Sequence, residues 1–442
     1  MTTRYQNQLN RTYEQQTKLM EQSDGAKLHR PSDDPIGYSK YLRYSISYGE
    51  NNQYQYNVKT AISWMKNSDS SLVDITNCFK TVVEKANQAQ GTNTDADMRA
   101  IAQEMLVQAQ QAVADANIEI NGRYMFSGQR DLVQPYNISY DKMEERGLTK
   151  TLDDKQEDFF TDAARSGDLV QMLVLKDEDS GSKYFLNTMT GNVYSEEFVE
   201  EGYKAKISSG QTTVQPGDEV GTISGWTGST DVSKYFDEYG IINNDGKATT
   251  FTLTSGGDLK LKFETVEQYV VTYQGDRKQF SMVKENGAVQ PATDTVNASG
   301  VEIAGSSIFD NKDSGNGRDA SGNYMGPSGA NAFNDMLTVV AMCNRGEKEG
   351  SRWMNTDGKT LANNAYNTVL NAESKLAARQ QVYSDCSDML VTQNETILGD
   401  ITDVHSTDVA KLAVEMMTAQ TIYQLSLSVG SRILPPTLAD YL

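Results

Sequence analysis

The chain has 442 residues, of which 38% are hydrophobic and 23% are charged, and its formal net charge at pH 7 is -20. This acidity argues against a nucleic-acid partner, because contacts with phosphates require a basic face. The length allows two or three domains, and the modest hydrophobic content favours an elongated molecule over a single sphere. The acidic excess lies mainly in residues 129–328. The middle is therefore expected to be solvated, whereas the nearly neutral ends can contact other copies.

The sequence gives no indication of a membrane anchor. No segment approaches the roughly 20 consecutive apolar residues of a membrane helix, so no membrane contact is predicted. The first 20 residues lack the apolar stretch of a secretory signal, so any export is expected to occur without a cleaved signal peptide. The three cysteines, Cys78, Cys343 and Cys386, lie far apart and predict neither a disulfide framework nor a zinc site. Each is interpreted as a small apolar residue on a helix.

Residues 1–128 are predicted to be helical. A weakly amphipathic segment over about 3–22 sets its apolar residues among Gln and Asn, and Gly25 interrupts it. A Ser-Asp-Asp-Pro motif then indicates a helix start, because Ser or Asp accepts hydrogen bonds from free N–H groups and Pro suits the first turn. The residues of this motif are Ser32, Asp33, Asp34 and Pro35.

A long helix is predicted after this motif. Its buried positions alternate by four and three residues over more than four heptads, which is typical of a coiled-coil seam. These positions are Val58, Ala61, Met65, Ser68, Leu72, Ile75, Phe79, Val82, Ala86 and Ala89. A turn with a capping residue at 91–95 leads to a second helix. Its apolar side comprises Met98, Ile101, Met105, Ala109, Ala112, Ala116 and Ile120.

Residues 129–328 change to a period of two and are rich in glycine, which predicts an inserted, mainly antiparallel β domain. Hairpins are expected around Gly191, around residues 256–258, and around Gly275, where 271–273 would pair with 280–282. The stretch 311–329 is rich in Gly and Ser and is interpreted as the returning linker. Asp310 to Asp319 only faintly resembles a calcium loop, because Ser321 stands where such a loop has Glu.

Residues 329–442 are predicted to be helical again, with a second seam of the same spacing. The seam positions are Val369, Ala372, Leu376, Arg379, Tyr383, Cys386, Leu390, Gln393 and Ile397. Gly399 and Asp400 are expected to interrupt this helix. Thr407 or Asp408 is expected to cap a final helix, which Pro435-Pro436 would end.

Helical seams at opposite ends of a chain most simply pair with each other. The expected fold is therefore α+β: an elongated, antiparallel coiled-coil helical bundle formed from both chain ends, with an inserted, mainly antiparallel β domain. Three parts follow from the sequence. They are terminal assembly helices (1–34 and 403–442), a helical bundle (35–128 and 329–402) and a β-rich outer domain (129–328).

The outermost helices carry too little apolar surface to be stable alone, since isolated helices of about 15–20 residues are marginal in water. They are expected to be disordered in a monomer and to order where other copies cover them. The predicted subunit-interface residues are Tyr5, Leu9, Tyr13, Leu19, Leu412, Met416, Tyr423 and Leu427.

Three motifs resemble a known family. The run from Asp24 to Gly37 is similar to the N-terminal signature of flagellins and of flagellar hook–filament junction proteins. Residues 122–128, Gly-Arg-Tyr-Met-Phe-Ser-Gly, and the ending Arg432-Ile433-Leu434 with Leu438 to Leu442 resemble the junction proteins. The resemblance covers about 1–128 and 330–442. It departs from the family at Pro435-Pro436-Thr437 and at Asp24, where a Ser is usual.

The resemblance implies a flagellin-like structural protein rather than an enzyme. It implies export through the flagellar type III apparatus with the help of a chaperone, and an extracellular location at the junction. There, a ring of copies would join hook-associated protein 1 to the flagellin filament.

Catalysis has little support in the sequence, and no catalytic residue, cofactor or metal site is predicted. The only histidines, His29 and His405, stand near predicted helix boundaries, where a surface or capping role is expected. Two alternatives stay open at this stage. One is a flagellin filament subunit, and the other is an exported protein whose acidic middle domain binds or hydrolyses carbohydrate.

Overall fold

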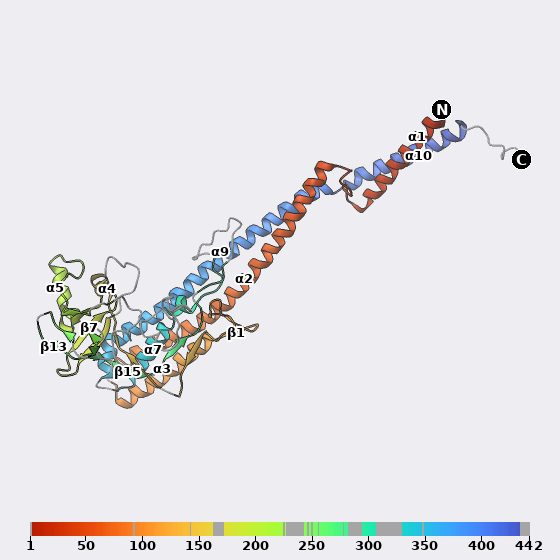
Figure 1. The fold of residues 1–442 in the computed structure, drawn as a ribbon. Helices are drawn as coiled ribbons and strands as arrows, with labels where there is room; N and C mark the ends of the chain where they lie inside the picture. Colours follow the sequence, from red (N-terminus) through yellow and green to blue (C-terminus); the bar gives the residue numbers. More distant parts are fainter. Residues whose placement is uncertain are drawn as a thin grey trace. The chain divides into compact units, whose positions relative to one another are not determined.

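The computed structural model describes residues 2–91, 93–141, 143–161, 172–223, 226, 243–244, 247–248, 251–254, 256–276, 278–281, 294–305, 329–346 and 349–433. The chain forms two compact units. One comprises residues 1–61 and 383–442, and the other comprises residues 62–382 (Figure 1).

The first unit is built from the two ends of the chain. Helix α1 (Thr2–Glu21) continues into a short 3-10 helix, η1 (Gln22–Asp24), and Gly25 ends it with a positive φ of 90°. Helix α10 (Val409–Ile433) lies side by side with α1 and runs antiparallel to it (Figure 1). The same unit holds the start of α2 (Pro35–Gln88) and the end of α9 (Lys359–His405).

Polar side chains join α2 to α9 within this unit. The Asn51 amide donates to Gln393 Oε1 at 3.2 Å, and the Gln55 amide donates to the Leu390 carbonyl at 3.1 Å. The predicted interruption at Gly399 and Asp400 is wrong, because α9 continues to His405. A glycine in a helix interior costs only about 1 kcal/mol relative to alanine, so the intact neighbouring turns carry the helix through.

The seams predicted from heptad spacing are confirmed. All ten positions of the first seam are buried, nine on α2 and Ala89 directly after its end. Seven of the nine positions on α9 are buried as well; Cys386 is half-buried and Gln393 is exposed. In the second unit, Thr76 on α2 donates to Glu373 on α9 at 2.7 Å. The other helices of this unit's bundle are α3 (Asp95–Ala116), α6 (Gly300–Ala304), α7 (Asn331–Cys343), α8 (Gly350–Trp353) and the π-helix η5 (Met354–Gly358).

The end of α3 differs from the prediction. The helix stops at Ala116, and Ile120 lies in strand β1 (Glu119–Ile120), which pairs with β2 (Arg123–Tyr124). Between the strands, Asn121 and Gly122 have φ values of 54° and 79°. An Asn-Gly pair is favoured in two-residue hairpin turns, which require positive φ at both positions. The turn therefore takes Ile120 out of the helix.

The main sheet of the second unit is antiparallel, in the order β14-β6-β7-β8-β9, with β5 also paired to β6. Its core consists of Leu173, Leu175, Leu186, Val193, Ile223, Phe251 and Leu261. The strands are β5 (Thr149–Lys150), β6 (Met172–Asp177), β7 (Lys183–Asn187), β8 (Asn192–Ser195), β9 (Gly221–Thr222) and β14 (Leu261–Phe263). Short helices flank the sheet: α4 (Asp154–Phe160), the π-helix η3 (Phe198–Gly202) and α5 (Tyr203–Ser208).

The remaining strands form antiparallel pairs: β3 (Tyr136–Ile138) with β16 (Val271–Tyr273), β4 (Glu144–Gly147) with β15 (Thr265–Gln268), β10 (Asn243–Asn244) with β11 (Lys247–Ala248), and β12 (Phe251–Thr252) with β13 (Asp258–Leu259). The hairpins predicted around Gly191 and residues 256–258 are confirmed by the β7–β8 and β12–β13 pairs.

The hairpin predicted around Gly275 is wrong, because 271–273 pairs with β3 instead. This pairing buries Tyr273, whose ring centroid lies 5.2 Å from that of Tyr136 and whose hydroxyl donates to the Phe126 carbonyl at 2.8 Å. Of the segment 280–282, Phe280 and Ser281 are described and Met282 lies outside the described residues. The predicted linker at 311–329 also lies outside them except for Gly329, and so does the stretch from Asp310 to Asp319. Pro435-Pro436 and the chain's last residues lie outside them too. The predicted α+β fold, with helical ends and an antiparallel β insertion, is confirmed.

Candidate functional site: the terminal helix pair

Helices α1 and α10 pack along one face of each. On both helices the less exposed residues recur every three or four positions, which is the spacing of a two-helix seam. On α1 they are Tyr5, Leu9, Thr12, Gln16 and Leu19, and on α10 they are Leu412, Met416, Ala419, Tyr423, Ser426 and Gly430. Six of the eight residues predicted for a subunit interface therefore lie on this seam within one chain. The other two, Tyr13 and Leu427, are exposed.

The far end of the pair is fixed by Tyr5. Its hydroxyl donates to the Ser426 carbonyl at 2.6 Å, and its ring lies directly over Gly430. A Cβ atom at position 430 would overlap the Tyr5 ring, so the close approach requires glycine. Further along the seam, the rings of Tyr13 and Tyr423 lie 6.3 Å apart.

A connector of residues 22–34 ties α1 to the start of α10. The Lys27 N–H donates to the His405 carbonyl at 2.6 Å, and the Thr407 N–H donates to the Gly25 carbonyl at 2.9 Å. Asp24 accepts from the Ala26 N–H and pairs with His29 Nε2 at 2.9 Å. The hydrogen bond with His29, followed by that from Ala26, lowers the pKa of the Asp24 carboxyl. Backbone hydrogen bonds thus join the connector to the segment that leads into α10, at one end of the helix pair.

The two carboxylates of the Ser-Asp-Asp-Pro motif have different hydrogen-bond partners. Asp34 accepts from the Ile36 N–H at 3.1 Å and caps α2, which begins at Pro35 as predicted. Asp33 instead closes the preceding turn through the N–H groups of Arg30 and His29, and its other oxygen lies 3.3 Å from Lys18 Nζ. The hydrogen bond from the Arg30 N–H lowers the pKa of the Asp33 carboxyl, and Lys18 adds to this effect. Burial acts in the opposite direction but has a smaller effect. Ser32 is exposed.

A second apolar face of α10 is exposed. Val414, Met417, Leu425 and Val429 retain 64%, 71%, 60% and 50% of their accessible surface, and their three-, eight- and four-residue spacing places them on one side. At 3.6 residues per turn this side is opposite the seam with α1. We call these four residues the outer stripe. The interface residues predicted on this helix do not include these four, although α10 is apolar on both sides.

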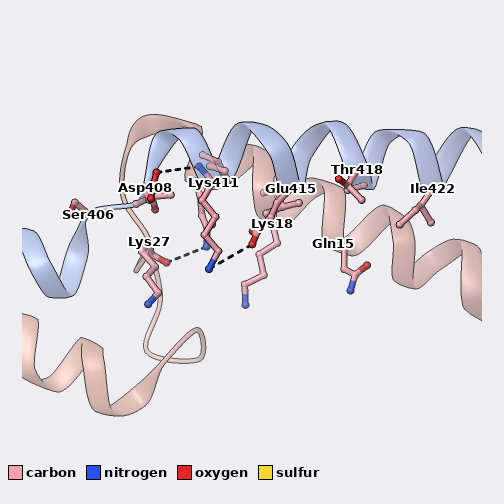
Figure 2. A pocket seen from close by; sticks show the side chains of 14 residues that line it. Gln15, Lys18, Lys27, Ser406, Asp408, Lys411, Glu415, Thr418 and Ile422 are labelled. Carbon is pink, nitrogen blue, oxygen red and sulfur yellow. Dashed lines mark hydrogen bonds and ion pairs between the residues drawn. The ribbon is translucent and has the colours of Figure 1, made fainter.

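An open groove of about 680 Å³ lies where α1, the connector and the start of α10 meet (Figure 2). Leu19, Leu412, Ala419 and Ile422 give it an apolar lining. The side chains of Lys18, Lys27 and Lys411 also line it (Figure 2). Lys411 lies 3.9 Å from Glu415. Asp408 accepts from the Ala410 and Lys411 N–H groups, so of the two predicted caps of α10 it is Asp408 that serves.

The histidines and cysteines occupy structural positions. His29 belongs to the connector, and the ring of His405 stacks on Tyr41 at 4.2 Å. Burial raises the pKa of the Cys78 thiol to about 11 and that of Cys343 to about 12, which disfavours a reactive thiolate. Among the described residues, no three His, Cys, Asp or Glu side chains gather in an arrangement that could hold a metal ion. None of the described helices combines the length and apolarity of a membrane crossing.

Residues 1–131 match the family described as the bacterial flagellin N-terminal helical region. This match covers the N-terminal part of the chain and is a similarity of that part alone. The chain is also 32% identical over 123 residues to flagellar hook-associated protein 3 of Salmonella typhimurium strain LT2. That match covers 27% of this chain and 39% of the relative, so the similarity spans about two fifths of the relative's length.

Solved structures of flagellar proteins also resemble the chain. The flagellar junction protein FlgL from Legionella pneumophila is 11% identical with a TM-score of 0.36, and the comparison covers 83% of this chain and 100% of that one. FlgL from Xanthomonas campestris is 14% identical with a TM-score of 0.35, over 81% and 97% of the two chains.

The flagellin-type helical region includes α1, the connector, α2 and α3. Helix α10, which carries the outer stripe, comes from the opposite end of the chain. The terminal helix pair therefore combines a helix from the matched region with a helix that the family match does not cover.

Proposed function

We propose that the chain is a structural subunit of the bacterial flagellum that joins the hook end to the filament. In this role a ring of copies contacts hook-associated protein 1 on one side and flagellin on the other, and the terminal helices make the contacts. The observation that carries the proposal is the outer stripe: α10 pairs with α1 on one face and exposes a second apolar face. A flagellin-type region on the same chain supports the flagellar setting.

The size of the outer stripe suits a subunit contact. Fully burying one large aliphatic side chain is worth about 1.5–3 kcal/mol. The four side chains still expose 50–71% of their surface, so covering them provides roughly 4–7 kcal/mol before costs are subtracted. Association itself costs about 4–15 kcal/mol in lost freedom. A single such contact is therefore weak, whereas a ring in which every copy contacts its neighbours adds many of them.

In the proposed role, the chain is exported to the flagellum and its three parts have different tasks. The chain leaves the cell through the flagellar type III apparatus without a cleaved signal peptide, and a chaperone covers its ends before export. Residues 1–34 and 403–442 assemble, residues 35–128 and 329–402 form the rigid bundle, and residues 129–328 face outward. Six of the eight predicted interface residues order α1 against α10. The exposed surfaces of Leu427 and of Tyr13, whose ring also lies near Tyr423, face neighbouring subunits. Catalysis has no part in this function.

Complementation of a strain that lacks the gene tests the proposal. The variant Met417→Asp/Leu425→Asp places two charges on the outer stripe, and the control Ala413→Asp/Gln420→Asp places the same charges at exposed positions beside it. We expect the stripe variant to be secreted but to leave cells with hooks, no filaments and flagellin in the medium, whereas the control restores swimming.

Two results would contradict the proposal. Normal filaments in cells that produce the stripe variant would show that assembly does not need the outer stripe. Purified protein that grows long filaments alone would favour the filament-subunit alternative instead.

A further inference from the structure

A second open groove, of about 480 Å³, lies in the second unit. Its walls come from three places: the segment of residues 149–157, which includes β5 and the first half of α4; the first residues of α7; and the side of α9 near its start. All three belong to residues 62–382. Small-molecule sites commonly have volumes of roughly 300–1,000 Å³, so the groove can hold a compact ligand.

The α9 wall of the groove is a row of amides. Asn364, Asn367 and Asn371 line it at a spacing of three and four residues and thus share one face of the helix. Asparagine is among the less favourable residues in a helix interior, so three of them on one face are not explained by helix formation. Within the described part of the chain their side chains form no hydrogen bond with protein groups. Each amide therefore offers two N–H donors and a carbonyl acceptor to the groove.

The facing wall supplies acceptors and an apolar surface. Asp154 and Glu157 line it, and neither forms an ion pair within the described residues. Burial raises the pKa of Glu157, and the carboxylates of Asp154 and Asp158 add to this effect. Thr151, which also lines the groove, has a buried hydroxyl with no hydrogen-bond partner among the described residues. Leu152 on this wall, and Leu361 from α9, contribute apolar surface.

The other charged groups that line the groove already have partners: Asp153 accepts from the Lys155 and Gln156 N–H groups as the N-cap of α4, and two more are in ion pairs. Lys150 Nζ lies 2.8 Å from both Asp357 and Glu200. Asp335 accepts from the Arg146 guanidinium at 3.2 Å. Among the described residues that line the groove, no unpaired cation is left to attract a phosphate or carboxylate ligand, and the unpaired acidic groups repel both. What remains for a ligand is a surface dominated by neutral amides, with carboxylate acceptors at one side.

From this chemistry we propose that the groove binds a neutral saccharide. Sugar hydroxyls both donate and accept, so they can satisfy the amide N–H and carbonyl groups of α9 together. The same hydroxyls donate to Asp154 and Glu157, and the C–H faces of a sugar ring pack on Leu152 and Leu361. This inference does not depend on the proposed role in the flagellum, because the groove involves neither α1 nor α10.

Saturation-transfer NMR and calorimetry on the full chain test this inference. The probes are glucose, galactose, mannose and N-acetylglucosamine with their common disaccharides, and spermidine serves as a cationic comparison. We expect at least one saccharide to bind. The variant Asn364→Ala/Asn367→Ala should weaken its binding at least tenfold. The control Asn363→Ala changes an adjacent asparagine whose amide donates to the Lys359 carbonyl, and should bind normally.

Alanine favours helices, so the variants should fold, and circular dichroism checks this. The inference is overturned if no saccharide of the panel binds, if spermidine binds and the saccharides do not, or if the double variant binds a saccharide as well as the unsubstituted protein does.

Discussion

The ion pair between Arg146 and Asp335 should be the most sensitive point of the second unit. Arg146 is 5% exposed and Asp335 is 8% exposed, and they connect strand β4 to helix α7. The guanidinium donates to Asp335 Oδ1 and Asn331 Oδ1, both at 3.2 Å, and to Thr338 Oγ1 at 3.1 Å. Replacing Arg146 by Met leaves a buried carboxylate without its cation.

Breaking a buried pair on one side costs about 3–5 kcal/mol, whereas replacing both partners by apolar residues is often neutral. We therefore expect Arg146→Met to lower the free energy of unfolding by about that amount, and Arg146→Met/Asp335→Leu to recover most of it. With a urea m-value of about 3 kcal/mol per molar, the single variant should shift the midpoint by about 1–1.7 M. Urea unfolding followed by circular dichroism measures both shifts.

The loss should also depend on pH. Burial raises the pKa of Asp335, and Arg146 opposes this effect. Without Arg146 the folded-state pKa rises further above the unfolded value, so the folded variant binds a proton more tightly than the unfolded chain does. The loss should then be small below the unfolded-state pKa and should grow as the pH rises toward the folded-state pKa. An equal loss at pH 4 and pH 7, or a single variant as stable as the unsubstituted protein, would refute this reasoning.

Three further predictions concern the helices. Gly430→Ala should weaken the α1–α10 pair by about 1–2 kcal/mol, because the added Cβ meets the Tyr5 ring. Gly399→Ala adds a Cβ in open space and should stabilise α9 by up to about 1 kcal/mol. Thermal unfolding compares the two variants, and equal stabilisation by both would contradict the close contact at Gly430. Burial and then Glu373 raise the pKa of Asp69, so Asp69→Asn should raise the melting temperature slightly at pH 7 and not near pH 3, which calorimetry can check. Hydrogen exchange on the dilute monomer should find weak protection at Leu9–Met20 and Leu412–Tyr423, and strong protection at both would show that the ends are complete without neighbours.

The heptad seams could be predicted because they depend on local spacing. Residues such as Leu72, Ile75 and Phe79 lie on one face wherever α2 is a helix, and that face must be buried. The cap at Asp34 was equally local, although its division of work with Asp33 was not visible in the motif. The Asn121-Gly122 turn could have been found as well, because this dipeptide is a strong hairpin signal.

Contacts between distant segments could not be predicted in the same way. Val271 and Tyr273 alternate like any strand, and nothing near them in the sequence selects β3 over residues 280–282. The choice depends on the site that Tyr136 and Phe126 create for Tyr273. Arg146 and Asp335 belong to this class too, since each looks like a surface residue until β4 and α7 come together. The outer stripe was missed for another reason: an apolar helix gives no sequence signal that separates the face it buries from the face it exposes.

The composition of the two seams explains why assembly would use the ends of the chain. The α2 seam holds Leu72, Ile75, Phe79 and Val82, all fully buried, each worth about 1.5–3 kcal/mol. The corresponding positions between α1 and α10 include Thr12, Gln16, Ser426 and Gly430, which bury little apolar surface. The terminal pair therefore gains much less from folding alone than the bundle does, while its outer stripe still has apolar surface to bury. In the proposed role, the ends would therefore gain most of their stability only when neighbouring copies cover α10.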